Sequence, residues 1–101
     1  MAVTFAEAKE AVRHEVSKTW KGTDPIYIPD WGCESDDFWG VCVGVAQFYV
    51  DNDPAYEVID DRAYLVNKET GDVEVKSVVD NLDWFDEQNF RNYGTIPAFF
   101  K

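Results

Sequence analysis

Basic side chains are scarce in this sequence, and one long stretch has none. The 101 residues include 9 Lys and Arg against 20 Asp and Glu, so the formal net charge is −11 at pH 7. Residues 30–61 contain nine acids and no Lys or Arg, which accounts for nine of the eleven excess negative charges. Such a chain repels nucleic-acid phosphates and anionic lipid heads, so direct binding to nucleic acids or membrane surfaces is disfavoured.

Cysteine and histidine are too few for the usual zinc sites. The chain has two cysteines, Cys33 and Cys42, and one histidine, His14, in a distant segment. A structural zinc site needs four ligands, usually at short paired spacings. We therefore expect no metal and no cofactor. We also expect reduced thiols, with the acids around Cys33 disfavouring its thiolate.

Long apolar runs are absent as well. The longest, residues 38–50, has about 13 residues and is too short to span a bilayer as a helix. Residues 1–7 lack the basic and apolar regions of a secretory signal. We expect a cytoplasmic protein of one domain, because 101 residues is a common size for a single domain.

Periodicity predicts two helices. Over residues 5–20 apolar side chains recur at spacings of three and four, which gives one buried face. Thr4 and Glu7 have the T-x-x-E spacing of a capping box at the start of this helix, and Gly22 is a candidate cap at its end. A weaker helical pattern predicts a shorter helix over residues 81–92.

Residues 38–50 have the strongest strand pattern in the chain. Valines at positions 41, 43 and 45 alternate with small residues, and both faces are free of charge. This pattern predicts one long central strand that is covered on both faces. Because the run is long for a straight strand, we expect a bend or bulge near Gly40 or Gly44.

A hairpin is predicted further along the chain. Residues 64–67 and 73–76 are strand-like and flank a turn in which Gly71 can take a positive φ. The two valines of the second strand should face one way, and its glutamate and lysine should face water.

The remaining segments give weaker patterns. Residues 26–28 are predicted to form a short edge strand, residues 30–37 a loop, and residues 98–101 an apolar tail that docks on the core. Together these elements predict an α+β fold, in which an N-terminal helix packs on a curved antiparallel sheet of three to four strands. A shorter C-terminal helix completes it.

The residue pattern contains no recognisable catalytic motif. A nucleophile beside a base, a metal set and a phosphate-binding loop are all missing. Adjacent acids such as Asp36 and Asp37 are candidates for an acid and base pair, but adjacent side chains point apart on a strand, and loop acids are usually solvated. We therefore expect that the protein is not an enzyme.

Acids at both ends of the apolar run predict a surface that binds a basic protein. Complementary charge speeds the encounter with such a partner, and an aromatic such as Trp31 supplies an anchor. The protein would then inhibit or neutralise its partner. The candidate partner-binding residues are Asp30, Trp31, Glu34, Asp36, Asp37, Asp51, Asp53, Asp60 and Asp61.

Two alternatives remain open at this stage. The carboxylates could imitate phosphates, which would make the chain a DNA mimic that blocks a nucleic-acid-binding enzyme. Such a mimic needs acids in rows at phosphate-like spacing. The simplest alternative is an acidic surface that only keeps the protein soluble.

The hairpin carries a resemblance to a known family. Residues 66–73 read Val-Asn-Lys-Glu-Thr-Gly-Asp-Val, and Asp37-Phe38-Trp39 opens the apolar run. In this motif and in the order of its elements, the chain resembles the YrhB-like immunity-type family of bacterial polymorphic toxin systems. In place of the glycine-proline pair of that family, the chain has Asp61-Arg62-Ala63 before the hairpin. The resemblance implies an α+β domain that binds and neutralises a protein without a cofactor.

Overall fold

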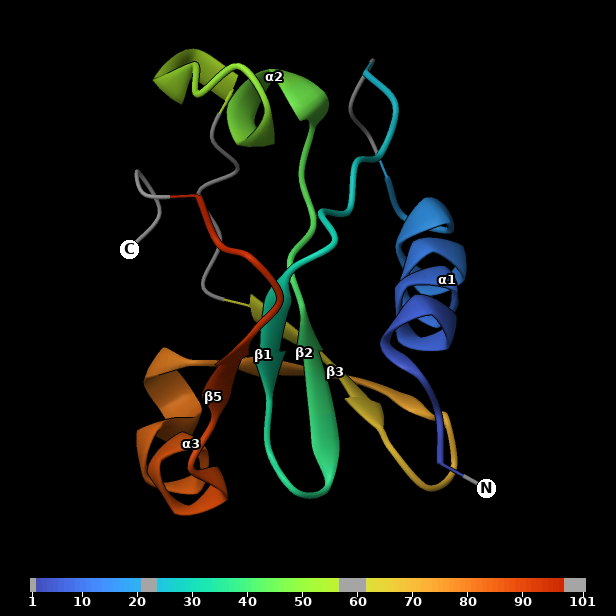
Figure 1. Cartoon of the computed structure of the whole chain (residues 1–101), viewed down its shortest axis with the longest axis vertical. Coiled ribbons are helices and arrows are strands. Elements are labelled where there is room, and N and C mark those ends of the chain that lie inside the picture. Colours follow the sequence, from blue (N-terminus) through green and yellow to red (C-terminus); the bar gives the residue numbers. More distant parts are fainter. Residues whose placement is uncertain (1, 21–23, 57–61, 98–101) are drawn as a thin grey trace.

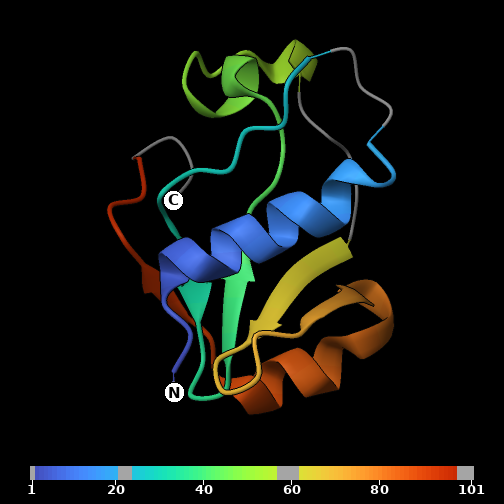
Figure 2. The same cartoon turned by 90° about the vertical axis from the view of Figure 1, so that its right-hand side faces the viewer.

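The fold is α+β, as predicted, with two helices on a five-stranded antiparallel sheet. The computed structural model describes residues 2–20, 24–56 and 62–97. Helix α1 (Phe5–Ser17) runs across one face of the sheet, and the short helix α3 (Leu82–Gln88) lies near the other end of the chain (Figures 1 and 2). No helix in these described ranges is long and apolar enough to cross a membrane.

The sheet has one strand more than the largest number expected. Its order is β4-β3-β2-β1-β5, and every neighbouring pair is antiparallel. The outer strands turn away from the direction of β1 and β2, so the sheet is curved (Figure 1). The strands are β1 (Gly32–Glu34), β2 (Phe38–Val41), β3 (Arg62–Asn67), β4 (Val73–Ser77) and β5 (Arg91–Tyr93).

Helix α1 begins where the sequence predicts and ends earlier. The Glu7 N–H donates to Thr4 Oγ1 at 3.2 Å, and the Thr4 N–H donates to Glu7 Oε1 at 3.0 Å, which completes the capping box. The predicted end at Trp20 is wrong. The Trp20 indole instead donates to the Asp24 carbonyl at 2.9 Å, in the segment after the helix. The predicted cap Gly22 lies outside the described residues.

The main core lies between α1 and the sheet. Trp39 on β2 is its largest side chain, with an edge-to-face contact to Phe5 at 5.4 Å between ring centroids. The Trp39 indole donates to the Val3 carbonyl at 2.8 Å, so the one polar atom of this buried ring is satisfied. The buried apolar residues of this core are Phe5, Ala8, Val12, Val16, Ile28, Trp39, Val41 and Val66.

The prediction of a single strand over residues 38–50 is wrong. Strand β2 stops at Val41, and a short helix, α2 (Ala46–Tyr49), follows. Between them Gly44 pairs with Tyr27 in an isolated bridge, which is the only strand-like feature of residues 26–28. A Cβ at Gly44 would lie 2.6 Å from the Tyr49 ring, so the glycine lets the chain fold back closely on itself.

The hairpin of β3 and β4 is confirmed, with Gly71 at φ +80° in its turn. On β4 the prediction is confirmed for Val73 and Val75, which share one face, and for Glu74, which is exposed, but it is wrong for Lys76. Val75 is 43% exposed, whereas the Lys76 side chain is only 22% exposed. Its ammonium lies 4.6 Å from the centroid of the Trp84 ring, so the lysine packs under α3 instead of facing water.

Two strands of the sheet were not predicted. The expected loop over residues 30–37 contains β1, which pairs with β2 on one side and with β5 on the other. The expected helix over residues 81–92 ends at Gln88, because Asn89 has a left-handed conformation at φ 55°. The chain then continues as β5. The predicted apolar tail, residues 98–101, lies outside the described residues.

Candidate protein-binding surface

The predicted partner-binding acids do not form one surface. Asp36 and Asp37 lie in the turn between β1 and β2, at one end of the molecule (Figure 1). Asp51 and Asp53 follow α2 and lie at the opposite end. The remaining pair, residues 60–61, falls outside the described residues. Any binding surface built on these acids therefore belongs to one end or the other.

Three of the predicted acids have basic partners among the described residues, and two of these pairs, those of Asp30 and Glu34, join separate elements of the fold. Asp30 forms an ion pair with Lys9 of α1. The hydrogen bond from Lys9, followed by the charge of that lysine, holds the pKa of Asp30 below its ordinary value of 3.8. Glu34 accepts a hydrogen bond from Lys68 at 2.7 Å, and these two side chains are only 25% and 20% exposed. Both acids hold elements of the fold together.

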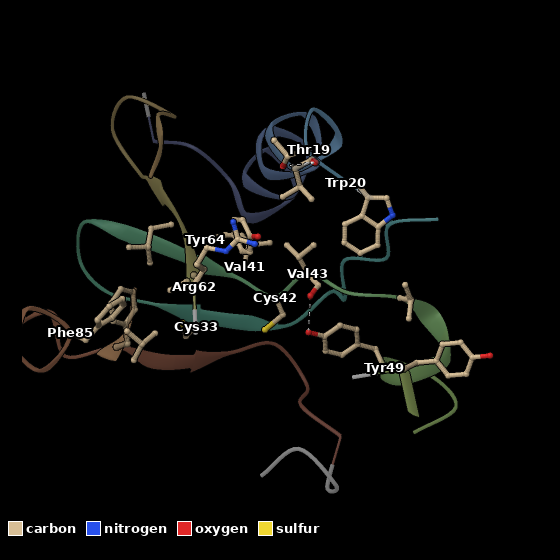
Figure 3. Close-up of a pocket in the computed structure, with 18 of the residues that line it drawn as sticks. Thr19, Trp20, Cys33, Val41, Cys42, Val43, Tyr49, Arg62, Tyr64 and Phe85 are labelled. Carbon is tan, nitrogen blue, oxygen red and sulfur yellow. Dashed lines mark hydrogen bonds between the residues drawn. The ribbon is translucent and has the colours of Figure 1, made fainter. Parts of the chain in front are cut away.

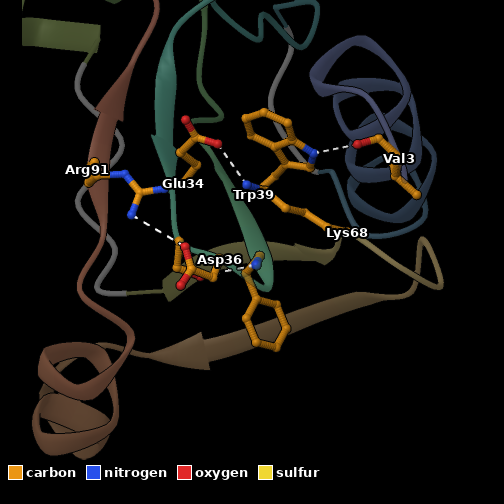
Figure 4. A network of polar contacts seen from close by, with 8 residues as sticks. Val3, Glu34, Asp36, Trp39, Lys68 and Arg91 are labelled. Atoms are coloured by element: carbon orange, nitrogen blue, oxygen red, sulfur yellow. Dashed lines mark hydrogen bonds and ion pairs between the residues drawn. The ribbon is translucent and has the colours of Figure 1, made fainter. Parts of the chain in front are cut away.

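The Glu34 ion pair belongs to a wider set of contacts around Trp39 (Figure 4). The Lys68 ammonium lies 4.4 Å from the centroid of the Trp39 ring, while the edge of the indole donates to the Val3 carbonyl. The ammonium is therefore shared between a carboxylate and the face of a buried ring. This arrangement joins β1, β2 and the turn after β3.

The acids in the turn between β1 and β2 are exposed. The side chain of Asp36 is 93% exposed, with an oxygen 3.6 Å from Arg91 Nη1 (Figure 4). Asp37 is also exposed, and no basic side chain of the described residues pairs with its carboxylate. Two hydrogen bonds close the turn: the Phe38 N–H donates to the hydroxyl of buried Ser35 at 3.1 Å, and the Ser35 N–H donates to the Phe38 carbonyl at 2.8 Å.

Trp31, the predicted aromatic anchor, is half-buried and directly precedes β1, at the end of the strand away from the turn. Its ring meets Tyr49 of α2 edge to face, with 5.6 Å between centroids. Gly94 packs directly on its backbone, since a Cβ there would lie 3.1 Å from the Trp31 Cα. The ring therefore helps to hold α2 and is separate from the turn acids.

A second group of aromatic rings lies beside the exposed turn. Trp84 of α3 meets Phe38 at 5.4 Å and Phe85 at 5.0 Å between centroids, and Phe90 lies 6.0 Å from Phe85. All four rings are half-buried, and none belongs to the main core. These rings cover the face of the sheet opposite α1.

Exposed acids are neighbours of these ring residues in the sequence. Helix α3 contributes three of them, and the turn between β1 and β2 contributes two. We call the rings and acids together the acid–aromatic surface. It consists of Phe38, Trp84, Phe85 and Phe90 with Asp36, Asp37, Asp83, Asp86 and Glu87.

The α3 part of this surface was missed in the sequence. Residues 77–90 contain four acids and no Lys or Arg, which is the same charge pattern as that of residues 30–61. The apolar positions of residues 77–90 fit a helical stripe only in part, so the pattern predicts a short helix and gives no sign of a binding surface. Residues 77–90 lie close to the turn between β1 and β2 because Trp84 packs against Phe38. These two residues are 46 positions apart in the sequence.

A cavity of about 1190 Å³ opens next to the acid–aromatic surface (Figure 3). Among the described residues its lining is largely apolar and aromatic, with Trp20, Tyr49 and Phe85 contributed by three different segments. Phe85, Asp86 and Phe90 belong both to this lining and to the acid–aromatic surface, so the two are continuous.

Both cysteines line this cavity and remain protonated at neutral pH. Burial raises the pKa of the Cys33 thiol. Burial, followed by the charge of Cys33, raises the pKa of Cys42 to about 11. The predicted cause, repulsion by acids in a loop, is wrong, since Cys33 is on β1 and burial is responsible. Protonated thiols are poor nucleophiles.

Tyr49 adds a phenol to the two thiols that line the cavity. Burial, followed by the charge of Cys42, raises the pKa of the Tyr49 phenol, and its hydroxyl donates to the Val43 carbonyl at 3.3 Å. Within the described ranges no group of three His, Cys, Asp or Glu side chains is placed to hold a metal ion. Because its lining is largely apolar, the cavity can accept apolar groups.

Comparisons with protein-family models, with curated proteins and with solved structures found no match to this chain.

Proposed function

We propose that this protein is a small acidic binding protein that inhibits or neutralises a basic protein partner through the acid–aromatic surface. The observation that carries the proposal is the contact of half-buried Trp84 with Phe38, which joins two segments that together carry five exposed carboxylates. Aromatic rings that become fully desolvated supply most of the energy in many interfaces. Charged groups at the rim guide the partner and select its sign.

The charges of this surface are available to a partner. Of the five acids, only Asp36 has an ion pair with a described basic residue, at 3.6 Å. The acids of α3 are exposed and carry no such pair within the part of the chain that the structure describes. A basic partner would pair with acids that the fold itself does not use, so little internal bonding would be lost on binding.

Lys76 supports the same chemistry. Its ammonium rests against the Trp84 ring, 4.6 Å from the centroid, which is a favourable position for a cation. In this proposal the part of the half-buried Trp84 ring that remains exposed receives a second cationic or apolar side chain from the partner. The expected partner segment therefore combines Lys or Arg with an apolar side chain.

The neutralising role is what the resemblance to immunity-type proteins implies. In this proposal the protein acts without catalysis and without a cofactor, and it meets its partner in the cytoplasm. The alternative of a DNA mimic gains no support from the placement of the acids, because the two predicted groups lie at opposite ends of the molecule (Figure 1).

Two variants with the same change in net charge test the proposal. Asp83→Asn with Glu87→Gln removes two charges from the acid–aromatic surface. Asp51→Asn with Asp53→Asn removes two charges from the opposite end and keeps the oxygen that accepts the Ala55 N–H at 3.0 Å. Each variant and the parent protein are immobilised, and the basic proteins that they retain from a lysate at low and high salt are identified by mass spectrometry.

The proposal predicts that a basic protein retained by the parent is lost with the first variant and kept with the second. The activity of the retained basic protein should fall when the soluble parent protein is added. Equal loss with both variants would show general charge attraction and would contradict the proposed surface. Retention by both would do the same.

A further inference from the structure

The outer edge of β4 is open among the described residues. The sheet order places β4 at one end, where it pairs with β3 alone. An edge strand of this kind presents backbone donors and acceptors to a further strand. Its outward groups can be identified from the hairpin, and they restrict which strand can be added.

Hydrogen-bonded pairs alternate along an antiparallel ladder. The Asn67 N–H donates to the Asp72 carbonyl at 3.0 Å, so in this register the next bonded pair is Leu65 with Glu74. The N–H and C=O groups of Glu74 and Lys76 therefore point toward β3. Those of Val73 and Val75 point outward.

The side chains of β4 divide between the two faces in the same alternation. Val75 stands opposite Tyr64 on the face that carries α1 and is 43% exposed. Glu74 and Lys76 stand on the other face and form an ion pair at 3.2 Å within one strand. Along the strand, Val75 is therefore preceded by an acid, Glu74, and followed by a base, Lys76.

We infer that β4 pairs antiparallel with β4 of a second copy of this chain, in a two-fold register centred on Val75. Two copies would then form one continuous sheet of ten strands, twice the five of each chain.

Charge selects this register over its neighbours. Among two-fold registers that pair at least three residues of each β4, outward backbone groups meet when the axis passes through Glu74, Val75 or Lys76. An axis at Glu74 places two glutamates opposite each other, and an axis at Lys76 places two lysines opposite each other. The axis at Val75 places Glu74 of each copy opposite Lys76 of the other, and directly opposite unlike charges stabilise a strand pair.

The dimer is expected to be weak and to become stronger with salt. Five residues in each strand bury little area compared with stable interfaces. Each copy also carries a net charge of −11, so the two copies repel each other over long distances. Salt screens this repulsion. Binding of a basic partner through the acid–aromatic surface has the opposite dependence on salt.

Charge reversal in β4 tests the register by sedimentation equilibrium. Glu74→Lys places lysines opposite lysines and should weaken self-association at least about tenfold. Lys76→Glu places glutamates opposite glutamates and should have the same effect. A mixture of the two single variants brings unlike charges together at all four positions, so mixed dimers should form. The double variant Glu74→Lys with Lys76→Glu should self-associate like the parent.

Circular dichroism of each variant shows whether the fold is retained. Lys76 also contacts Trp84, so a substitution there could weaken self-association indirectly. The mixture and the double variant control for this, because both restore the opposite charges across the strand pair. The inference predicts recovery in both. A parent protein that stays monomeric at about 1 mM in high salt would overturn it. Self-association that is as strong in both single variants as in the parent would also overturn it, because the contact would then lie elsewhere.

Discussion

Phe38 of β2 and Trp84 of α3 meet edge to face, with ring centroids 5.4 Å apart and ring planes at 68°. This contact joins the turn after β1 to a helix near the end of the chain. It brings the exposed acids of two distant segments to one end of the molecule (Figure 1). The proposed surface therefore depends on one long-range packing contact.

The two rings should be energetically coupled. Replacing either Phe38 or Trp84 with leucine removes the edge-to-face contact while an apolar side chain remains. A double-mutant cycle in urea unfolding should give a coupling free energy of about 0.5–1.5 kcal/mol, as aromatic pairs do. Additive effects of the two substitutions would show that the rings do not hold α3 against the sheet.

Gly40 should be intolerant of a side chain because of Cys33. A Cβ at Gly40 would lie 2.2 Å from Cys33 Sγ on the neighbouring strand. Gly40→Ala should therefore reduce the free energy of unfolding by about 1–3 kcal/mol. In a Cys33→Ala background the sulfur is gone, and the same substitution should cost much less. Equal costs in the two backgrounds would mean that the contact with the sulfur is unimportant.

The capping box should make stability depend on pH in the acid range. Hydrogen bonds from the Thr4 backbone and then from its side chain hold the pKa of Glu7 below its ordinary value of 4.5. A carboxyl with a lowered pKa in the folded state stabilises the fold above its ordinary pKa, and this contribution is lost as the pH falls through the lowered value. In urea unfolding the difference between the parent and Glu7→Gln should shrink below about pH 4.5. A constant difference would argue against the capping role.

The two thiols should react slowly in the folded protein. A pKa of about 11 for Cys42, against an ordinary 9.0, lowers its thiolate fraction at neutral pH by about a hundredfold. Labelling with iodoacetamide at neutral pH should accordingly be slow and should speed up in denaturant. In Cys33→Ala, labelling reports Cys42 alone. Fast labelling of the folded form of this variant would contradict burial as the cause.

Local patterns in the sequence predict the elements whose determinants lie close together in the chain. The capping box needs only Thr4 and Glu7, and the β3–β4 hairpin needs only a turn with Gly71 between two β-prone segments. Both are confirmed. The fold class followed from these elements together with the apolar face of α1.

The errors arise where tertiary contacts override the local pattern. The alternation through residues 41–45 predicts a continuing strand, but Gly44 bonds Tyr27 and packs against Tyr49, so the chain turns into α2. Strands β1 and β5 are too short and too polar to show a pattern of their own, and they form by pairing with neighbours, β1 with β2 and β5 with β1. The α3 part of the acid–aromatic surface was missed for the same reason.

An NMR titration with a short synthetic peptide of lysine and leucine tests the central claim most directly, since it locates a basic ligand on the protein without a known partner. The indole N–H of Trp84 and the amides of α3 and of residues 36–38 should shift progressively with added peptide. The shifts should disappear in the Asp83→Asn, Glu87→Gln variant, while the amides of residues 51–53 should not move. Shifts of residues 51–53 as large as those of α3 would contradict the acid–aromatic surface as the binding site.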